Sequence, residues 1–285
     1  MCEFCTKHGE GKKWYEIMEH YSRELLNDPD RKTYIQRFVP SIRNNAKNNL
    51  HRLEWVKKRA PIAHRFIRKM ATANLKKYHF GQVVPLEDAE RIVEMVQSVT
   101  RIACICRSVL AGKNDARYCL LLGIDPTGLC DDWPELKAGL EILTSSDAKR
   151  ILRDFDKQGL VHSIWTFKTP FIGAICNCDG DCLAYRFQIG SDLVELMFRA
   201  EYIACLEMDL CTGCRSCMSF CQFDAIEYSD AKCYINPQKC YGCGVCRAAC
   251  KNQAIKLYDL DGDAISNGEE ESIKEDSLFP LETLN

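Results

Sequence analysis

Apolar side chains recur at helical spacing through the first eighty residues. Positions three or four apart share one face of a helix, and the pattern repeats over residues 14–25, 42–56 and 66–78. Pro40 and Pro61 fall between these repeats, and proline commonly marks a helix boundary. The pattern therefore predicts a helical region over residues 1–84, divided near the two prolines.

The middle region, residues 85–200, combines helical and extended patterns. Periodicity predicts three helices, near residues 85–99, 118–122 and 147–158. Two short apolar segments rich in strand-forming residues follow, at 160–167 and 171–178. Helices followed by a hairpin predict a winged-helix-like domain, so the fold class expected for the whole chain is α+β.

A winged helix would suggest DNA binding, but the charge of this region argues against it. The expected recognition helix carries basic and acidic residues in near balance, with Lys149, Arg150, Arg153 and Lys157 against Asp147, Asp154 and Asp156. Such a helix matches a phosphate surface poorly. We therefore expect a protein scaffold in this region, and no nucleic-acid partner.

Charge is distributed much less evenly than the total of −2 indicates. Residues 31–80 contain fourteen Lys or Arg and one acid, whereas residues 259–285 contain nine acids and one base. The basic helices fit three interpretations: a solvated surface, a docking site for an acidic protein partner, or a patch for nucleic acid or membrane. The acidic tail has little apolar content and is expected to be disordered.

Cysteine provides the clearest chemical signal among these 285 residues, which include 19 cysteines. The spacing C-x2-C-x2-C-x3-C occurs twice, in CTGCRSCMSFC from residue 211 and CYGCGVCRAAC from residue 240, at an offset of 29 residues. Soft thiolates at these gaps suit iron–sulfur clusters. Zinc sites, the alternative, use paired knuckles separated by longer gaps.

This pattern resembles the bacterial two-[4Fe–4S] ferredoxin domain over about residues 205–258, and we place the domain at 201–258. The resemblance implies two pseudo-symmetric halves in which the fourth cysteine of each run ligates the other cluster. One cluster is then expected on Cys211, Cys214, Cys217 and Cys250, and the second on Cys240, Cys243, Cys246 and Cys221. Gln222 and Lys251 replace the proline usual in that family, which puts loop rigidity and reduction potential in question.

A second group of cysteines lies upstream, with members Cys104, Cys106, Cys176, Cys178 and Cys182 and Cys119 as an additional candidate. The pairing of CICR with CNCDGDCL resembles a segment that precedes ferredoxin modules in iron–sulfur proteins of anaerobes. The two C-x-C pairs are expected in extended segments, where residues two apart face the same side. The group predicts a third cluster or another metal site; buried, unligated cysteines are the alternative.

The N-terminus holds a further candidate metal site. Cys2, Cys5 and His8 are close enough in sequence to begin a zinc or iron site that takes a fourth ligand from elsewhere. The alternative is a frayed terminus with free thiols.

Together these patterns predict an electron-transfer protein or subunit rather than a stand-alone enzyme. It would pass low-potential electrons through two [4Fe–4S] clusters and the third metal site to a partner oxidoreductase. Two alternatives are a small reductase with substrate at an open iron, and a redox- or iron-sensing winged-helix regulator.

No nucleotide-binding glycine fingerprint and no apolar segment of the roughly 20 residues needed to span a bilayer are present. Many cysteines without a secretory signal indicate a reducing cytoplasm, with an anaerobic host as a further expectation.

Overall fold

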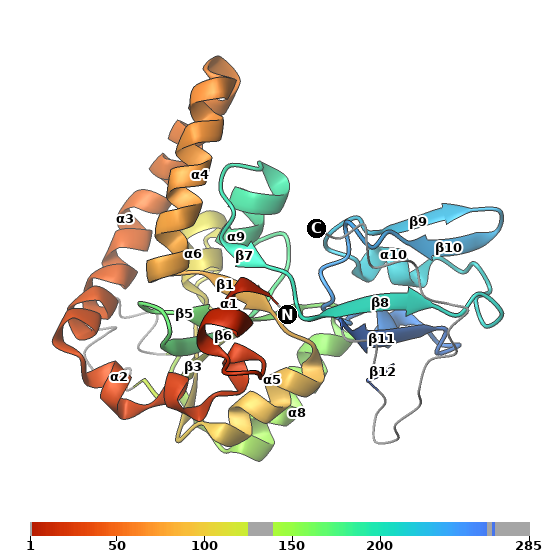
Figure 1. Ribbon diagram of the computed structural model, residues 1–285, viewed down its shortest axis with the longest axis horizontal. Coiled ribbons are helices and arrows are strands. Elements are labelled where there is room, and N and C mark those ends of the chain that lie inside the picture. The colour runs from red at the N-terminus through yellow and green to blue at the C-terminus, as the bar shows by residue number, and fades with distance from the viewer. Residues whose placement is uncertain (1, 125–138, 261–263, 266–285) are drawn as a thin grey trace.

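The computed structural model describes residues 2–124, 139–260 and 264–265. It consists of a larger unit built around a seven-stranded sheet and a smaller C-terminal unit, joined near residue 200 (Figure 1). None of the helices within the described ranges combines the length and the apolar composition that a bilayer span requires.

The N-terminal part is helical, as its periodicity predicts. It contains α1 (Glu3–His8), turns of 3₁₀ helix at Trp14–Glu16 and Met18–Tyr21, α2 (Arg23–Asn27), α3 (Pro29–Arg59) and α4 (Pro61–Tyr78). Pro61 begins α4 as expected, but Pro40 lies inside α3, so the boundary expected there is wrong. Buried contacts of Ile35 and Ala46, on either side of Pro40, hold the helix together through the proline.

The seven-stranded sheet is the centre of the larger unit. Its strands are β1 (Gly81–Val83), β2 (Val99–Ile102), β3 (Cys119–Leu122), β4 (Glu141–Leu143), β5 (Val161–Thr166), β6 (Ile172–Cys178) and β7 (Met197–Phe198). They lie in the order β4-β2-β3-β6-β5-β1-β7. Neighbours are antiparallel except for β1 and β7, which are parallel.

This sheet corrects the winged-helix expectation for residues 85–200. The expected hairpin exists as β5 and β6, but it lies at the centre of the sheet, where every residue of β5 is buried. Residues 118–122 form a strand rather than a helix, because β3 pairs with both β2 and β6. Since β1 pairs with β5, the expected regions 1–84 and 85–200 share one sheet and are not separate domains.

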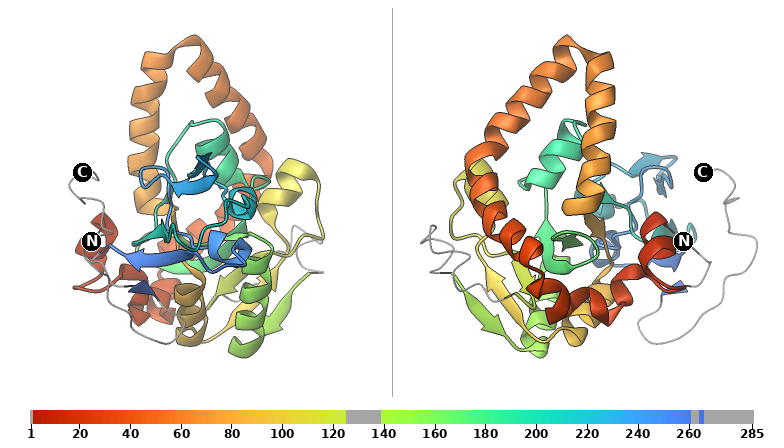
Figure 2. Two further views of the ribbon diagram at one scale, coloured as in Figure 1. Left: turned by 90° about the vertical axis from the view of Figure 1, so that its right-hand side faces the viewer. Right: turned by 60° about the vertical axis from the view of Figure 1, so that its left-hand side comes forward.

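Helices cover both faces of the sheet. On one face α5 (Leu86–Met95) and α8 (Ser145–Lys157), both expected from the sequence, pack Ile92, Leu152 and Phe155 against the strands. On the opposite face lie the long α3–α4 hairpin, α6 (Ile105–Ala111) and α9 (Leu183–Tyr185), followed by a π-helical turn at Arg186–Gly190 (Figure 2). The upstream cysteines of β6 face this second layer.

The C-terminal unit is formed by β8 (Tyr202–Leu206), α10 (Ser216–Phe220), β9 (Ile226–Ser229), β10 (Lys232–Ile235), α11 (Cys246–Ala249), β11 (Ile255–Asp259) and β12 (Ala264–Ile265). β8 pairs with β11, and β9 pairs with β10. The disorder expected for the acidic tail concerns mainly residues 261–263 and 266–285, which lie outside the described residues.

A half-buried ion pair joins the two units. Arg247 of α11 makes two bonds to the Glu87 carboxylate at the start of α5, at 2.8 and 2.9 Å. Burial opposes the ionisation of Glu87, but the hydrogen bond and charge of Arg247 outweigh it and lower the pKa of Glu87. This bidentate contact fixes the C-terminal unit against the sheet unit.

Candidate functional site

The two cysteine runs of the C-terminal unit share one backbone conformation. Gly213 and Gly242 stand at equivalent places in the runs, and both have a φ of +67°. A Cβ at Gly213 would lie 2.0 Å from a backbone oxygen, and one at Gly242 would lie 2.1 Å from another. Only glycine fits such a position without strain, so the sequence repeat is also a structural repeat.

Backbone amides point at sulfur in the same repeated way. Two of these amides belong to the glycines just described, and their nitrogens lie 3.4 Å from a cysteine sulfur. The other two belong to the alanines four residues after the fourth cysteine of each run, and their nitrogens lie 3.3 Å from that sulfur. The pairs are Gly213 to Cys211, Gly242 to Cys240, Ala225 to Cys221 and Ala254 to Cys250. Amide hydrogen bonds of this kind stabilise sulfur ligands and set the potential of a cluster.

Four thiols from the two runs surround one cavity of about 290 Å³. They are Cys211, Cys214, Cys217 and Cys250, and Cys233, which belongs to neither run, also lines the cavity. Burial, together with the neighbouring Cys233 and Cys250 thiols, raises the pKa of Cys217 to about 12. The cavity therefore brings three thiols of the first run together with the last thiol of the second.

The other four thiols lie deeper. Cys243 and Cys246 are buried, and Cys240 and Cys221 are half-buried. Burial raises the pKa of Cys246, and the neighbouring Cys243, Cys240 and Cys221 thiols raise it further. Cys221 and the three thiols of the second run belong to the same core cluster, which also includes Cys211, Cys217 and Cys250 of the first set.

The six upstream cysteines also meet, although they come from four separate segments. The Cys104 and Cys119 sulfurs are 3.3 Å apart, those of Cys119 and Cys176 are 3.8 Å apart, and those of Cys178 and Cys182 are 3.1 Å apart. A hydrogen bond to Cys182 raises the pKa of Cys106. One to Cys176 raises the pKa of Cys178. All six sulfurs therefore form one connected group, here called the six-thiol group.

The elements that present these thiols differ partly from the sequence expectation. Cys176 and Cys178 lie on strand β6, as expected for an extended C-x-C pair. Cys104, however, is the N-cap of α6 and Cys106 lies in its first turn, so this pair is not extended. Cys119 begins β3 directly opposite Cys176 and is a central member of the group.

A buried cation accompanies the six-thiol group. Arg107 is only 3 % exposed, and its Nη1 lies 3.5 Å from the Cys104 sulfur. Its Nη2 is 2.9 Å from the carboxylate of Asp179. A guanidinium beside cysteines favours the thiolate form that binds metal, so the charge at this place suits a thiolate-ligated cluster.

An apolar cavity of about 480 Å³ adjoins the six-thiol group. Cys106, Cys119, Cys176 and Cys182 form part of its wall, and side chains of α3 and of the sheet form most of the remainder. His79, which also lines it, is half-buried, and burial lowers its pKa to about 4. The wall near pH 7 is therefore largely uncharged.

At the N-terminus the structure places Glu201, rather than His8, beside the two thiols. The sulfurs of Cys2 and Cys5 are 3.5 Å apart, and Cys5 donates to a carboxylate oxygen of Glu201 at 3.0 Å. The His8 ring instead faces His20, with ring centroids 6.3 Å apart. Glu201 is far away in sequence, so spacing gave no signal for it.

Comparison with known proteins identifies one family in this chain. The model of the 4Fe-4S binding domain matches residues 205–227, which contain all four cysteines of the first run. The chain therefore carries an iron–sulfur segment of ferredoxin type, which indicates a [4Fe–4S] cluster and supports a general role in electron transfer. No curated protein matches the chain.

Proposed function

We propose that this protein carries low-potential electrons through two [4Fe–4S] clusters in residues 201–258 and passes them to a partner oxidoreductase. The observation that supports this most strongly is the repeated geometry of the two cysteine runs, together with the cavity that Cys250 of the second run lines with three thiols of the first run. Each set supplies the four thiolates that a cubane cluster needs. The clusters would supply single-electron transfer, while the amides directed at sulfur tune their potentials.

A third iron–sulfur cluster on the six-thiol group extends this proposal. The thiols are soft ligands suited to iron, and buried Arg107 offsets part of the negative charge that a thiolate-bound cluster carries. The adjoining cavity provides space next to four of these sulfurs. The donor set and its charge thus fit the group.

Tyr185 provides the connection between the six-thiol group and the second ferredoxin set. Its side chain is buried in the same core cluster as Cys178 of the six-thiol group and Cys243 of the second ferredoxin set. Its ring stacks on Phe223, which stacks on Tyr241 with centroids 4.0 Å apart. We infer that electrons pass between the third cluster and the second ferredoxin cluster beside this aromatic group.

The Tyr185 hydroxyl has no hydrogen-bond partner within the described residues, although it is buried. We expect it to donate to a cluster sulfur, and such a bond raises a reduction potential because it stabilises the reduced, more negative state. Tyr185→Phe should then lower the potential of one cluster by roughly 60 mV, which corresponds to a tenfold change in a one-electron equilibrium. Redox titration followed by electron paramagnetic resonance (EPR) measures this shift.

The control for this experiment is Tyr21→Phe, because the Tyr21 hydroxyl donates to the Tyr15 carbonyl and lies among aromatic residues of the other sheet face. It should leave every cluster potential unchanged. Identical potentials in the Tyr185→Phe variant and the wild type would remove Tyr185 from the electron path.

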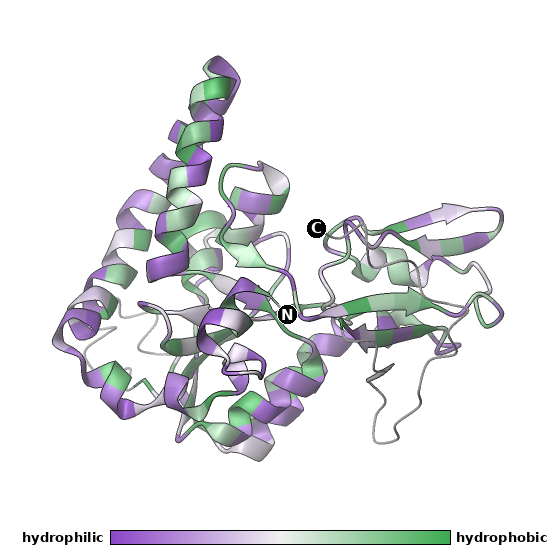
Figure 3. Ribbon diagram, viewed as in Figure 1, coloured by the Kyte–Doolittle hydropathy of each residue, from purple (hydrophilic) through white to green (hydrophobic). Residues whose placement is uncertain are grey.

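The α3–α4 hairpin is the surface that we propose for the partner. Trp55, Ile62, Phe66 and Met70 are exposed along it, among the basic residues of this region. Figure 3 shows hydrophobic and hydrophilic positions alternating along the two helices. Apolar anchors within a basic surface suit an acidic protein. Electron exchange with an acidic low-potential carrier protein should slow as ionic strength rises, and a rate independent of salt contradicts this docking site.

The apolar cavity favours a second function, a small reductase fed by its own ferredoxin-type unit. A substrate in the cavity would lie against Cys106, Cys119, Cys176 and Cys182, and so against the third cluster. Apolar electron acceptors should then alter the EPR signal of the third cluster alone. An unchanged spectrum favours the carrier function. The regulator alternative depended on a winged helix, and the seven-stranded sheet is not one. The abundant thiols suit a reducing, oxygen-poor cytoplasm.

A further inference from the structure

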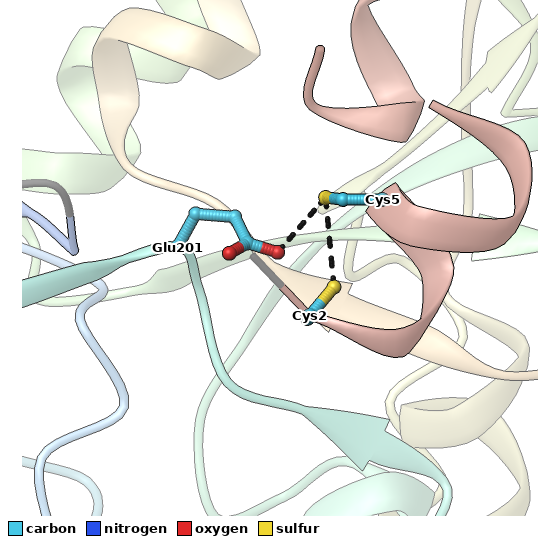
Figure 4. A group of neighbouring side chains, drawn as sticks. All are labelled: Cys2, Cys5 and Glu201. Carbon is cyan, nitrogen blue, oxygen red and sulfur yellow. Dashed lines mark hydrogen bonds between the residues drawn. The ribbon is translucent and has the colours of Figure 1, made fainter. Parts of the chain in front are cut away.

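We propose that the protein binds one zinc ion through Cys2, Cys5 and Glu201, at the place where its two units join. The two sulfurs and one carboxylate oxygen all lie within 4.8 Å of one another. Figure 4 shows the Glu201 carboxylate directed toward the thiols of Cys2 and Cys5 at the start of α1. Cys5 and Glu201 are 196 positions apart, so the fold and not the local sequence assembles this site.

Local structure positions all three ligands. Cys2 is the N-cap of α1 and Cys5 lies one turn later, so both thiols project from one face of the helix. Glu201 immediately precedes β8, on the segment that links the sheet unit to the C-terminal unit. Cys5 and Glu201 are buried and Cys2 is half-buried.

The charges at this site call for a cation. A buried carboxylate is costly unless a positive charge accompanies it, and no salt bridge formed within the described residues includes Glu201. When an ion binds, the two thiols release their protons, and a divalent ion held by two thiolates and one carboxylate leaves a local charge of −1. Two soft sulfur ligands and one oxygen ligand, brought together at short range, favour zinc among the common divalent ions.

A second layer of hydrogen bonds holds the ligands in place. The Gln82 amide nitrogen lies 3.4 Å from the Glu201 oxygen and 3.8 Å from the Cys2 sulfur, and it donates to the Arg199 carbonyl at 3.1 Å. The indole of Trp14 donates to the Gln82 amide oxygen and so fixes the orientation of the amide. Metal ligands are typically oriented by such outer donors.

Three protein ligands leave one tetrahedral position open. Cys2 and Glu201 line a cavity of about 550 Å³ that also touches Cys240, a thiol of the second ferredoxin set. Water from this cavity can complete the coordination. The ion would thus fasten the N-terminal helix to the link between the units, close to the second cluster.

The test uses the full chain, purified without oxygen and analysed for zinc and iron by mass spectrometry. We expect about one zinc per chain, and zinc-edge X-ray absorption should show sulfur at about 2.3 Å and oxygen or nitrogen at about 2.0 Å. Glu201→Gln, which preserves side-chain size, should weaken zinc roughly tenfold or more against a chelator. The Cys2→Ser, Cys5→Ser double variant should lose zinc entirely.

His8→Ala is the matched control, because the structure turns His8 away from the two thiols, and it should retain zinc. Iron content should remain at the wild-type value in all variants. Unchanged iron would show that the substitutions affect the zinc site and not the clusters, and that the variants still fold. Zinc-free wild-type protein, zinc retained without Cys2 and Cys5, or equal loss in His8→Ala would each overturn the assignment.

Discussion

Cys246→Ala should remove one ferredoxin-type cluster and spare the other. Cys246 is buried in α11, in the same core cluster as Cys243, Cys240 and Cys221, the other thiols of the set proposed for this cluster. A cubane without its fourth thiolate is poorly held, and the iron content should fall by about four atoms per chain. The remaining cluster should give an EPR signal without the broadening caused by a neighbouring reduced cluster.

Cys205→Ala is the control for this prediction, because Cys205 is a half-buried thiol of β8 that belongs to neither set. Its iron content and spectrum should match those of the wild type. Crossed ligation also predicts which cluster each fourth cysteine holds. Cys221→Ala should eliminate the same cluster as Cys246→Ala, whereas Cys250→Ala should eliminate the other. Loss of the first-run cluster on replacing Cys221 would refute the assignment.

The second large effect is expected in the six-thiol group. The Cys119 thiol makes hydrogen-bond contacts to Cys104 and Cys176, and the Cys182 thiol makes them to Cys178 and Cys106, so each is central to one half of the group. A Cys119→Ala, Cys182→Ala double variant should lose about four further iron atoms. The EPR signals of the two ferredoxin-type clusters should persist, since the repeated loops lie in the other unit.

The same Cys205→Ala protein serves as control for this double variant, since it also lacks a thiol but leaves the group whole. Near-ultraviolet circular dichroism checks that the sheet unit still folds. Equal iron in the double variant and the wild type would show that these thiols are structural and hold no cluster.

Sequence reasoning succeeded where the chemistry is local. The ferredoxin-type run from Cys211 to Cys221 depends on gaps of two and three residues, and the family comparison bears out an iron–sulfur segment there. The helices at residues 86–95 and 145–157 also follow from short-range periodicity. Such features depend on neighbours in the chain, so the sequence contains them.

It failed where partners are distant. The segment CLLL at residues 119–122 reads equally well as a helix or a strand, and only pairing with β2 and β6 decides. Pro40 marks no boundary, because buried contacts on both sides of it outweigh the local signal. Glu201 has no local motif at all, since the fold alone brings it to Cys5.

The most direct test of this account is a count of iron and acid-labile sulfide in anaerobically purified protein, combined with EPR of the reduced form. Two ferredoxin-type clusters and a third on the six-thiol group predict about twelve iron atoms per chain, with a magnetically coupled pair and one additional signal. About eight iron atoms and the coupled pair alone would contradict the third cluster, and with it the path through Tyr185.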